Sequence, residues 1–341
     1  MNAPVLRRAA SLKALNSFAL DVRAGRLLEL RDAAELPAAL AELRAHPPAL
    51  VLGGGSNLLF TRDPPGTVLL VALAGRRVLE QRDGEALVEA AAGENWHAFV
   101  EWTLAQGLCG LENLALIPGS VGASPIQNIG AYGVEMREHF DSLDAVSLAD
   151  GQCRRYTASE CAFGYRDSVF RRAAGAHWLV TAVRFRLSRT PRLQLDYGEI
   201  RDELRAQGVV DPGPPDVARA VCAIRRRKLP DPAVLGNAGS FFKNPLVDPA
   251  LAGRLRAVHP GMPLHRATSP GSVKLSAAWM IEQCGWKGYR DGDAGVHAAH
   301  ALVLVNHGRA TGAQILALAE RIRTSVRERF GVDLEREPAV V

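Results

Sequence analysis

A run of three glycines followed by two polar residues stands after a short apolar segment at residues 49–52. The run is Gly53, Gly54, Gly55, Ser56 and Asn57. Glycines let a backbone come close to a ligand and direct N–H groups toward phosphate oxygens. The spacing is not that of a Rossmann dinucleotide fold, because no glycine stands three places after Gly55. The run therefore predicts either a phosphate-binding loop or a tight turn between strands.

A second segment, residues 117–133, combines small residues with amides and one tyrosine. Its small residues allow close backbone approach, while Gln127, Asn128 and Tyr132 could hydrogen-bond a planar ligand with polar edges. A loop that only connects two elements rarely needs this mixture. The segment therefore favours a ligand-binding loop, and it strengthens the same interpretation of the glycine run.

Several other polar residues have simple structural interpretations when each is taken alone. Arg166 could form a surface ion pair with Asp167, which would contribute little to stability. Ser240, after a glycine, could belong to a turn or a helix cap. The basic run at 225–228 ends a helix predicted from about residue 217, where cations oppose the negative end of the helix dipole. We prefer this last interpretation for the three arginines of the run.

Five segments, taken together, closely resemble the UDP-N-acetylenolpyruvoylglucosamine reductases, flavoenzymes of bacterial peptidoglycan precursor synthesis. They are residues 53–57, 117–133, 164–168 (GYRDS), 236–245 (GNAGSFFKNP) and 271–275 (GSVKL). The resemblance runs in order from about Asn16 to Glu337. It implies an α+β fold, in which two N-terminal subdomains of the vanillyl-alcohol-oxidase (PCMH) type bind FAD and a C-terminal α+β domain binds the UDP-sugar. NADPH would reduce the flavin, leave, and be replaced by UDP-N-acetylglucosamine enolpyruvate, which becomes UDP-N-acetylmuramate.

The resemblance assigns both glycine-containing segments to FAD. The residues expected to bind the cofactor are Gly53, Gly54, Gly55, Ser56, Asn57, Ile117, Pro118, Gly119, Gly122, Ala123, Ser124, Gln127, Asn128, Gly130 and Tyr132.

Three catalytic residues are also implied by the resemblance. Arg166 matches an arginine whose planar fork can bind the substrate carboxylate. Ser240 matches the donor of a proton to the second substrate carbon, after hydride from flavin N5 reaches the terminal carbon. Glu337 matches a glutamate that assists charge stabilisation. Because Arg336 stands where relatives often have proline, Glu335 remains an alternative to Glu337.

Four further residues match positions that bind substrate in the family. Tyr197, which precedes Gly198, matches the tyrosine of the loop that closes over substrate in the type I branch. Lys228 and Asn244 match positions that could meet the diphosphate and the sugar. His300 stands where relatives often have glutamine, which leaves its contact open.

No metal site and no nucleic-acid partner are expected. His297, His300 and His307 have no carboxylate or cysteine at a recognised spacing. The five scattered cysteines indicate neither a disulfide framework nor a zinc site, and they suit a reducing cytoplasm. The tryptophans and phenylalanines are spread over expected core positions rather than arranged as stacking platforms.

Hydrophobic periodicity and breakers predict the elements that position these residues. Strands are expected at 49–52, 67–72, 86–92, 144–148, 178–187 and 301–305, and helices at 95–107, from about 217, at 275–284 and at 312–330. In the strand at 178–187, Val183, Phe185 and Leu187 should be buried, and Arg184 and Arg186 exposed. Four parts are expected: FAD-binding subdomains at 1–66 and 67–215, a substrate domain at 216–330, and a catalytic tail at 331–341.

Composition bounds these expectations. Of the 341 residues, 48% are hydrophobic and 23% are charged, which excludes a disordered or collagen-like chain. The net charge of +5 suits an anionic small molecule as readily as nucleic acid. No apolar run approaches the roughly 18 residues of a membrane span. A monomeric cytoplasmic protein is expected, with two alternatives: another flavin oxidase of the superfamily, or a sugar-nucleotide-binding protein that has lost its flavin.

Overall fold

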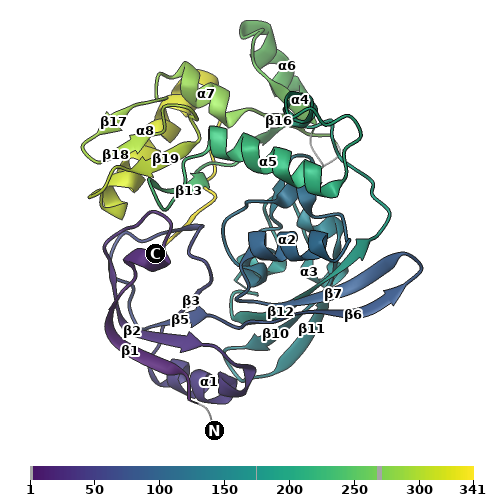
Figure 1. The fold of residues 1–341 in the computed structure, drawn as a ribbon. Helices are drawn as coiled ribbons and strands as arrows, with labels where there is room; N and C mark the ends of the chain where they lie inside the picture. Colours follow the sequence, from purple (N-terminus) through teal and green to yellow (C-terminus); the bar gives the residue numbers. More distant parts are fainter. Residues whose placement is uncertain (1–2, 174, 267–270) are drawn as a thin grey trace. The chain divides into compact units, whose positions relative to one another are not determined.

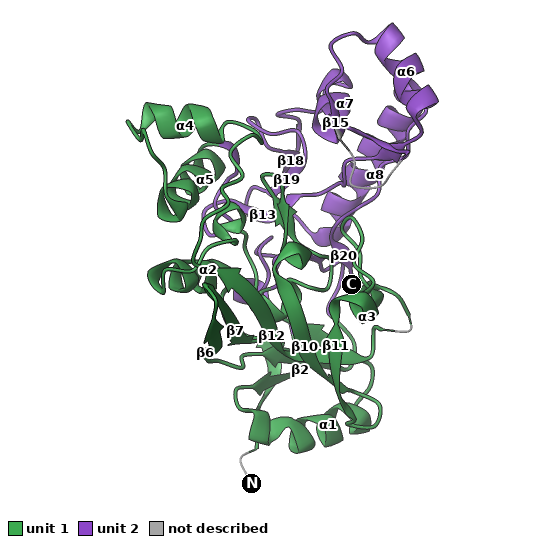
Figure 2. Ribbon diagram, turned by 90° about the vertical axis from the view of Figure 1, so that its right-hand side faces the viewer, with its two compact units in different colours: residues 1–10, 24–54, 64–227 green, residues 11–23, 55–63, 228–341 purple. Residues whose placement is uncertain are grey.

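The computed structural model describes residues 3–173, 175–266 and 271–341 (Figure 1). They form two compact units, which are coloured separately in Figure 2. The first contains residues 1–10, 24–54 and 64–227, and the second contains residues 11–23, 55–63 and 228–341. The second unit thus takes in two short N-terminal segments from the range expected to form the first subdomain. The division into three domains and a tail stays a prediction.

The centre of the first unit is an antiparallel five-stranded sheet with the order β11-β10-β12-β7-β6. Its strands are β6 (Arg76–Arg82), β7 (Glu85–Ala91), β10 (Phe140–Ser147), β11 (Cys153–Thr157) and β12 (Trp178–Ser188). Helix α2 (Trp96–Ala105) begins where the Asn95 side chain accepts a hydrogen bond from the Ala98 N–H. Trp96, Phe99 and Phe185 form the aromatic centre of the core between helix and sheet. These elements carry the loop at 110–133.

A second sheet has the order β1-β2-β5-β3. It contains β1 (Val5–Ser11), β2 (Arg23–Leu30), β5 (Thr67–Val71) and β3 (Ala49–Leu52), and the last three are parallel. The glycine run follows β3 directly. Helices α1 (Leu36–Ala45), α3 (Ala158–Cys161), α4 (Ile200–Ala206) and α5 (Pro214–Lys228) complete this part of the chain.

The second unit has a four-stranded sheet with the order β13-β19-β18-β17. Its strands are β13 (Gly236–Ser240), β17 (Arg290–Asp291), β18 (Ala294–Val296) and β19 (Val303–Asn306). A smaller sheet joins β14 (Leu246–Val247), β15 (Leu264–Arg266) and β16 (Val273–Leu275), and β4 (Leu58–Leu59) pairs with β20 (Ala339–Val340). The helices are α6 (Pro249–Val258), α7 (Ala277–Gln283) and α8 (Gly312–Phe330).

The predicted α+β class and most predicted elements are confirmed. Helix α8 has the predicted bounds, and the Thr311 and Gln314 side chains form a capping box at its start. One detail of β12 is wrong. Arg184 is buried rather than exposed, because its guanidinium pairs with Glu89 and Asp144, each at 2.5 Å. Burial alone would raise the pKa of Asp144, but hydrogen bonds from Arg184 and Arg155 outweigh that effect and lower it to about 2.

Candidate active site

In the first unit, the two predicted cofactor segments meet backbone to backbone. A Cβ atom on Gly53 would lie 2.6 Å from the Ser120 Oγ, and one on Gly54 would lie 2.7 Å from the Gly119 Cα. Only glycine allows so close an approach. The loop at 119–123 is fixed in turn by main-chain hydrogen bonds to the turn before α2, such as Gly122 N–H to the Ala92 carbonyl at 2.9 Å. The contact between the two cofactor segments is therefore made mainly by main-chain atoms.

The other half of the glycine run belongs to the second unit. Gly55 has φ of +60°, and a Cβ there would lie 2.0 Å from the Leu15 carbonyl oxygen. The Gly55 carbonyl accepts a hydrogen bond from the Ser17 N–H at 3.0 Å. Farther along, the Asn57 side-chain amide donates to the Glu337 carbonyl at 3.3 Å. Residues distant in sequence thus hold this half of the run.

Two side chains of the expected cofactor loop are bound within the protein. Asn128 is fully buried and donates to the Glu135 carboxylate and the Gly164 carbonyl, both at 3.0 Å, while its oxygen accepts from the Arg137 N–H at 3.1 Å. The Ser124 hydroxyl donates to the Val121 carbonyl at 2.7 Å. Both side chains are used to hold the loop in shape. We therefore expect Asn128 and Ser124 to contact a ligand through their backbone atoms.

Arg166 stands on a tight turn in which Gly164 and Asp167 exchange main-chain hydrogen bonds of 2.9 and 3.3 Å. Its guanidinium donates to the Gly130 carbonyl at 2.7 Å, which ties the turn to the cofactor loop. Asp167 pairs with Arg172 at 2.7 Å. The Arg166 guanidinium therefore links the turn to the cofactor loop, and the alternative of a surface ion pair with Asp167 stays a prediction.

Backbone strain is concentrated around this turn and loop. Eight non-glycine residues in the described ranges have positive φ, and four of them are Leu116 (58°), Asn128 (45°), Tyr132 (48°) and Arg166 (53°). Such conformations cost about 1–3 kcal/mol each and persist only where the surroundings enforce them. This clustering supports the assignment of a functional site.

The loop that carries Tyr197 lies against the cofactor loop. A Cβ on Gly133 would be 3.2 Å from the Tyr197 Cβ, and one on Gly198 would be 3.7 Å from a ring carbon of Tyr132. The Asn113 amide joins the two loops, because it donates to the Tyr132 carbonyl at 2.9 Å and the Gln194 carbonyl at 2.8 Å. Tyr197 keeps 42% of its surface exposed.

Arg225 is a site candidate that the sequence analysis missed. Its Nε donates to the Leu116 carbonyl at 3.2 Å, and no carboxylate pairs with it among the residues that the structure describes. Burial lowers the pKa of Arg225, and the neighbouring positive charge of Arg166 lowers it further. The signal was helical periodicity, because Arg225 follows the buried Val221 by four residues and so lies on the buried face of α5.

The other two arginines of the run fit the structural interpretation better. Arg226 is exposed, and Arg227 pairs with Glu199 at 2.9 Å and with Glu203 at 2.7 Å. The basic run therefore contains one half-buried cation and two surface cations before Lys228.

In the second unit, Ser240 stands at the end of β13, opposite Val303 of β19. The pairing shifts between Asn237 and Ser240, where Gly239 has φ of +68°. The Asn237 side chain stabilises this irregularity by accepting from the Gly239 N–H at 2.8 Å. A bulge of this kind re-aims the next side chain. The fold thus gives Ser240 an orientation that a regular strand would not.

Residues 335–337 pair with residues 241–243, which directly follow the Ser240 strand. The Glu337 N–H donates to the Phe241 carbonyl and the Lys243 N–H donates to the Glu335 carbonyl, both at 2.9 Å. The Lys243 ammonium pairs with the Glu335 carboxylate. Glu337 is therefore next to the residue that follows Ser240, whereas Glu335 is engaged by Lys243.

The predicted sugar-nucleotide residues of the second unit have distinct surroundings. The Asn244 side-chain oxygen accepts from the Ala277 N–H at 3.0 Å, at the start of α7. The His300 Nδ1 accepts from the Leu302 N–H at 3.3 Å. Burial lowers the pKa of His300, and the positive charges of Lys228 and Lys287 lower it further. Its neutral ring therefore offers an N–H donor at Nε2, as a glutamine amide would.

Lys287 was not predicted as a site residue. It lies between Gly285 and Gly288 in a turn, where it pairs with Glu282 at 2.9 Å and influences His300 electrostatically. Lys228 and Lys287 thus both place positive charge near the neutral His300 ring within the second unit. In the sequence, a lysine between two turn glycines could have indicated a binding residue, but many surface turns have the same pattern.

The predicted catalytic and substrate-binding residues are divided between the units. Arg166 and Tyr197 belong to the first unit, as does Arg225. Ser240, Asn244, His300, Glu337 and Lys228 belong to the second. Within the described ranges, no group of three or more His, Cys, Asp or Glu side chains could hold a metal ion.

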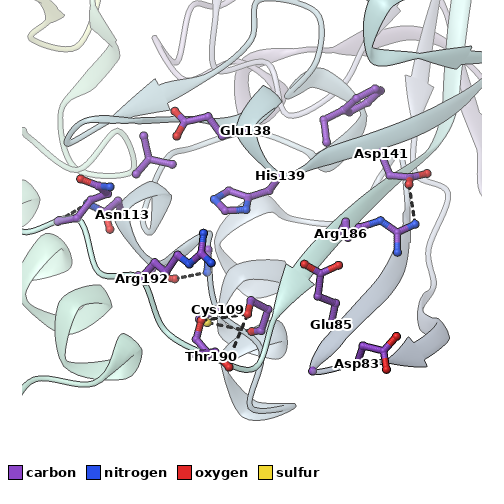
Figure 3. Close-up of a pocket in the computed structure, with 17 residues that line it drawn as sticks. Asp83, Glu85, Cys109, Asn113, Glu138, His139, Asp141, Arg186, Thr190 and Arg192 are labelled. Atoms are coloured by element: carbon purple, nitrogen blue, oxygen red, sulfur yellow. Dashed lines mark hydrogen bonds and ion pairs between the residues drawn. The ribbon is translucent and has the colours of Figure 1, made fainter.

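A cavity of about 710 Å³ in the first unit contains none of the predicted site residues. Figure 3 shows the His139 ring in this cavity, with Asp141 and Arg186 paired at 3.0 Å. Cys109 also lines it, but burial raises the pKa of that thiol to about 11, which leaves it protonated. The cavity is therefore distinct from the candidate site and contains no reactive thiolate.

Comparison with known proteins decides the family. Residues 25–157 match an FAD binding domain, and residues 231–341 match the C-terminal domain of UDP-N-acetylenolpyruvoylglucosamine reductase. The reductases of that name from Chromobacterium violaceum and Pseudomonas aeruginosa are 57% and 56% identical to this chain, over 98% of it and 98% of each relative. The chain belongs to the UDP-N-acetylenolpyruvoylglucosamine reductase family.

The fold agrees with this assignment. The crystal structure of UDP-N-acetylenolpyruvylglucosamine reductase from Thermus caldophilus matches 99% of this chain and 99% of that one, with a TM-score of 0.67 and 26% identity. This protein is thus an FAD-dependent oxidoreductase of peptidoglycan precursor synthesis. Family membership replaces the two alternatives, another flavin oxidase and a flavin-free binding protein. None of the described helices has the length and apolar character needed to cross a membrane.

The residues present fit FAD. Both glycine-containing segments lie in the range that matches the FAD binding domain. Their contact through Gly53, Gly54 and Gly119 leaves main-chain groups, rather than side chains, to face a ligand, which suits a diphosphate. Ser240, Asn244, His300 and Glu337 lie in the range that matches the reductase C-terminal domain.

Proposed function

We propose that this reductase converts UDP-N-acetylglucosamine enolpyruvate to UDP-N-acetylmuramate with NADPH as the electron donor. The observation that carries the proposal is the bulge that re-aims Ser240, with Glu337 bound to the adjacent Phe241. When bound, FAD supplies the hydride that reduces the terminal carbon of the enol ether. The chain's own residues then have to bind the carboxylate, stabilise its added charge and deliver one proton.

Arg166 is suited to the carboxylate. Reduction at the terminal carbon pushes electron density onto the carboxylate oxygens, and a guanidinium can meet both oxygens while it keeps its charge. The tie to Gly130 and the strained turn hold the Arg166 backbone in place before substrate arrives. Arg225, whose pKa is lowered by the nearby positive charge of Arg166, would add a second cation, and no carboxylate within the described ranges pairs with it.

Ser240 would protonate the carbon next to the carboxylate. A serine hydroxyl is a weak acid, so it acts only when it is held against a developing carbanion that is much more basic than itself. The Gly239 bulge provides such fixed placement. Glu337 would assist by stabilising charge or by orienting the proton donor.

The remaining predicted residues would hold the sugar nucleotide. Lys228 and Lys287 are suited to the diphosphate as point charges, and neutral His300 offers a hydrogen-bond donor. The Tyr197 loop, already in contact with Tyr132 and Gly133, would close over the ligand. A monomeric state is part of the same proposal and can be checked by light scattering.

An anaerobic titration tests the proposal. Purified protein should be yellow, NADPH should bleach the flavin, and UDP-N-acetylglucosamine enolpyruvate should restore its colour. Ser240→Ala should be bleached normally but reoxidised about 10²–10⁴-fold more slowly, since only the second half-reaction needs carbon protonation. Ser11→Ala, at an exposed position, serves as the control. Normal reoxidation of Ser240→Ala would remove its assigned role, and a colourless protein that does not take up FAD would refute the whole proposal.

A further inference from the structure

The segment beside the Ser240 strand contains two glutamates, either of which could be the catalytic carboxylate. Glu335 and Glu337 are two residues apart, and in an extended segment such residues point to the same side. The hydrogen bonds of this segment to Phe241 and Lys243, together with the bridge between Phe242 and Arg336, show that it pairs as a strand does. The pairing register of this segment therefore decides which of the two glutamates reaches the active site.

Lys243 binds residue 335 at two points. Its N–H donates to the Glu335 carbonyl at 2.9 Å, and its ammonium pairs with the Glu335 carboxylate. The Lys243 side chain is only 11% exposed, whereas that of Glu335 is 68% exposed. A lysine whose side chain is largely buried loses more by losing its ionic partner than a glutamate that stays exposed to water. Loss of the ion pair would thus destabilise Lys243 more than Glu335.

A second tie lies on the other side of Glu337. The Asn57 amide donates to the Glu337 carbonyl at 3.3 Å, and the Ala339 N–H donates to the Asn57 carbonyl at 3.1 Å. The position of Glu337 is consequently fixed on its N-terminal side by the Lys243–Glu335 pair and on its C-terminal side by Asn57. A slip of one residue would replace Glu337 with a neighbour of opposite or no charge, and a slip of two would bring Glu335 to its place.

We propose that Lys243 is a positioning residue, which holds Glu335 and thereby places Glu337 rather than Glu335 at the active site. This inference rests on the proposed function, in which Glu337 takes part in the second half-reaction. Lys243 itself need not touch substrate or cofactor. Its effect is to fix the register of the segment that carries the functional carboxylate.

Stopped-flow measurement of the two half-reactions, with flavin content and thermal unfolding measured in parallel, tests this inference. Lys243→Met should be reduced by NADPH within about twofold of the normal rate but reoxidised by substrate about 10–100-fold more slowly, the size expected of a small misplacement. Lys243→Arg should recover most of this loss. The double variant with Lys243→Glu and Glu335→Lys should recover reoxidation to within about threefold, which a general loss of packing would not allow. Lys13→Met, at an exposed position, is the control and should behave normally.

Two outcomes would overturn the inference. Either Lys243→Met is reoxidised at the normal rate, or the exchanged pair is no better than the single variants. Glu337→Gln separates this failure from that of the proposed function. If Glu337→Gln is reoxidised normally, the assigned role of Glu337 is wrong and the inference falls with it. If Glu337→Gln is slow while Lys243→Met is normal, the role of Glu337 stands and only the positioning role of Lys243 is refuted.

Discussion

In the first unit, the candidate site residues stand on loops whose backbone is strained, whereas in the second they stand on or beside strands that distant segments tie down. Arg166 and Tyr132 have positive φ and depend on nearby side chains such as Asn128. Ser240 and Glu337 depend on pairing between residues far apart in the sequence, including Asn57. The difference indicates that substitutions in the first unit should act locally, while those in the second should disturb the positions of several segments at once.

The largest effect on stability is expected from Gly55→Ala, which disrupts the contact between Gly55 and Leu15 in the second unit. The new Cβ would lie 2.0 Å from the Leu15 carbonyl oxygen at a residue with φ of +60°. We expect a loss of at least about 3 kcal/mol in the free energy of unfolding, or failure to fold. Denaturant unfolding measures this. Gly253→Ala, in α6 with nothing within 4 Å of the new Cβ, is the control and should not destabilise; equal midpoints for the two variants would contradict the prediction.

Arg166→Lys tests the strained turn of the first unit through function rather than stability. Lysine keeps the positive charge but cannot reproduce the planar fork, so reoxidation by substrate should slow about a hundredfold while reduction by NADPH changes little. Stopped-flow absorbance of the flavin separates the two steps. Arg172→Lys, at the exposed partner of Asp167, provides a matched control. An unchanged reoxidation rate for Arg166→Lys would show that its fork does not bind the carboxylate.

Asn128→Ala should break the local support of the first unit. It removes two donated bonds and one accepted bond from a fully buried side chain. The unpaired groups left behind should cost about 2 kcal/mol of stability. We expect weaker FAD retention in the same variant, measured as free flavin after gel filtration, because the cofactor loop and the Arg166 turn lose a common tie. Full flavin content together with normal stability would show that the loop does not need this side chain.

The smallest effect is a dependence of stability on pH that both units should share. Burial lowers the pKa of His139 in the first unit and of His300 in the second below the ordinary value of 6.5. The unfolded chain therefore binds more protons than the folded one as the pH falls below 6.5, so stability is full above that value and declines through the folded pKa values. Thermal unfolding between pH 8 and pH 5 should show this decline, and His139→Gln should reduce its slope. A flat or opposite slope would contradict the assignment of neutral buried rings.

Local patterns were enough to predict the elements that carry strong signals. Helix α8 combines a capping box, an apolar stripe and a terminal glycine, and the bounds of β3 are set by breakers on both sides. Other elements gave weak patterns: β1 is exposed along nearly its whole length, and β6 carries a mixture of charged and apolar residues. Periodicity cannot identify a strand whose two faces look alike.

The candidate site was predicted where motifs are long, and missed where burial decides the role. The sequence could not show that Arg225 is half-buried while Arg227 is paired on the surface, since both follow from how α5 packs. Nor could it distinguish Glu335 from Glu337, because spacing alone places both on one side of a strand. That choice depends on Lys243, which is 92 residues from Glu335 in the sequence. Pairing over such distances leaves no trace in a local pattern.

The pairing of β4 with β20 also bears on the order in which the protein can assemble during translation. Thr61 and Val341, which are hydrogen-bonded at 2.9 Å, are 280 residues apart. Residues 55–63 must therefore wait for their partner until the ribosome has completed residues 64–338, of which residues 64–227 can already condense around their own sheet. Nascent chains stalled before residue 339 should leave the 58–61 segment accessible to a protease.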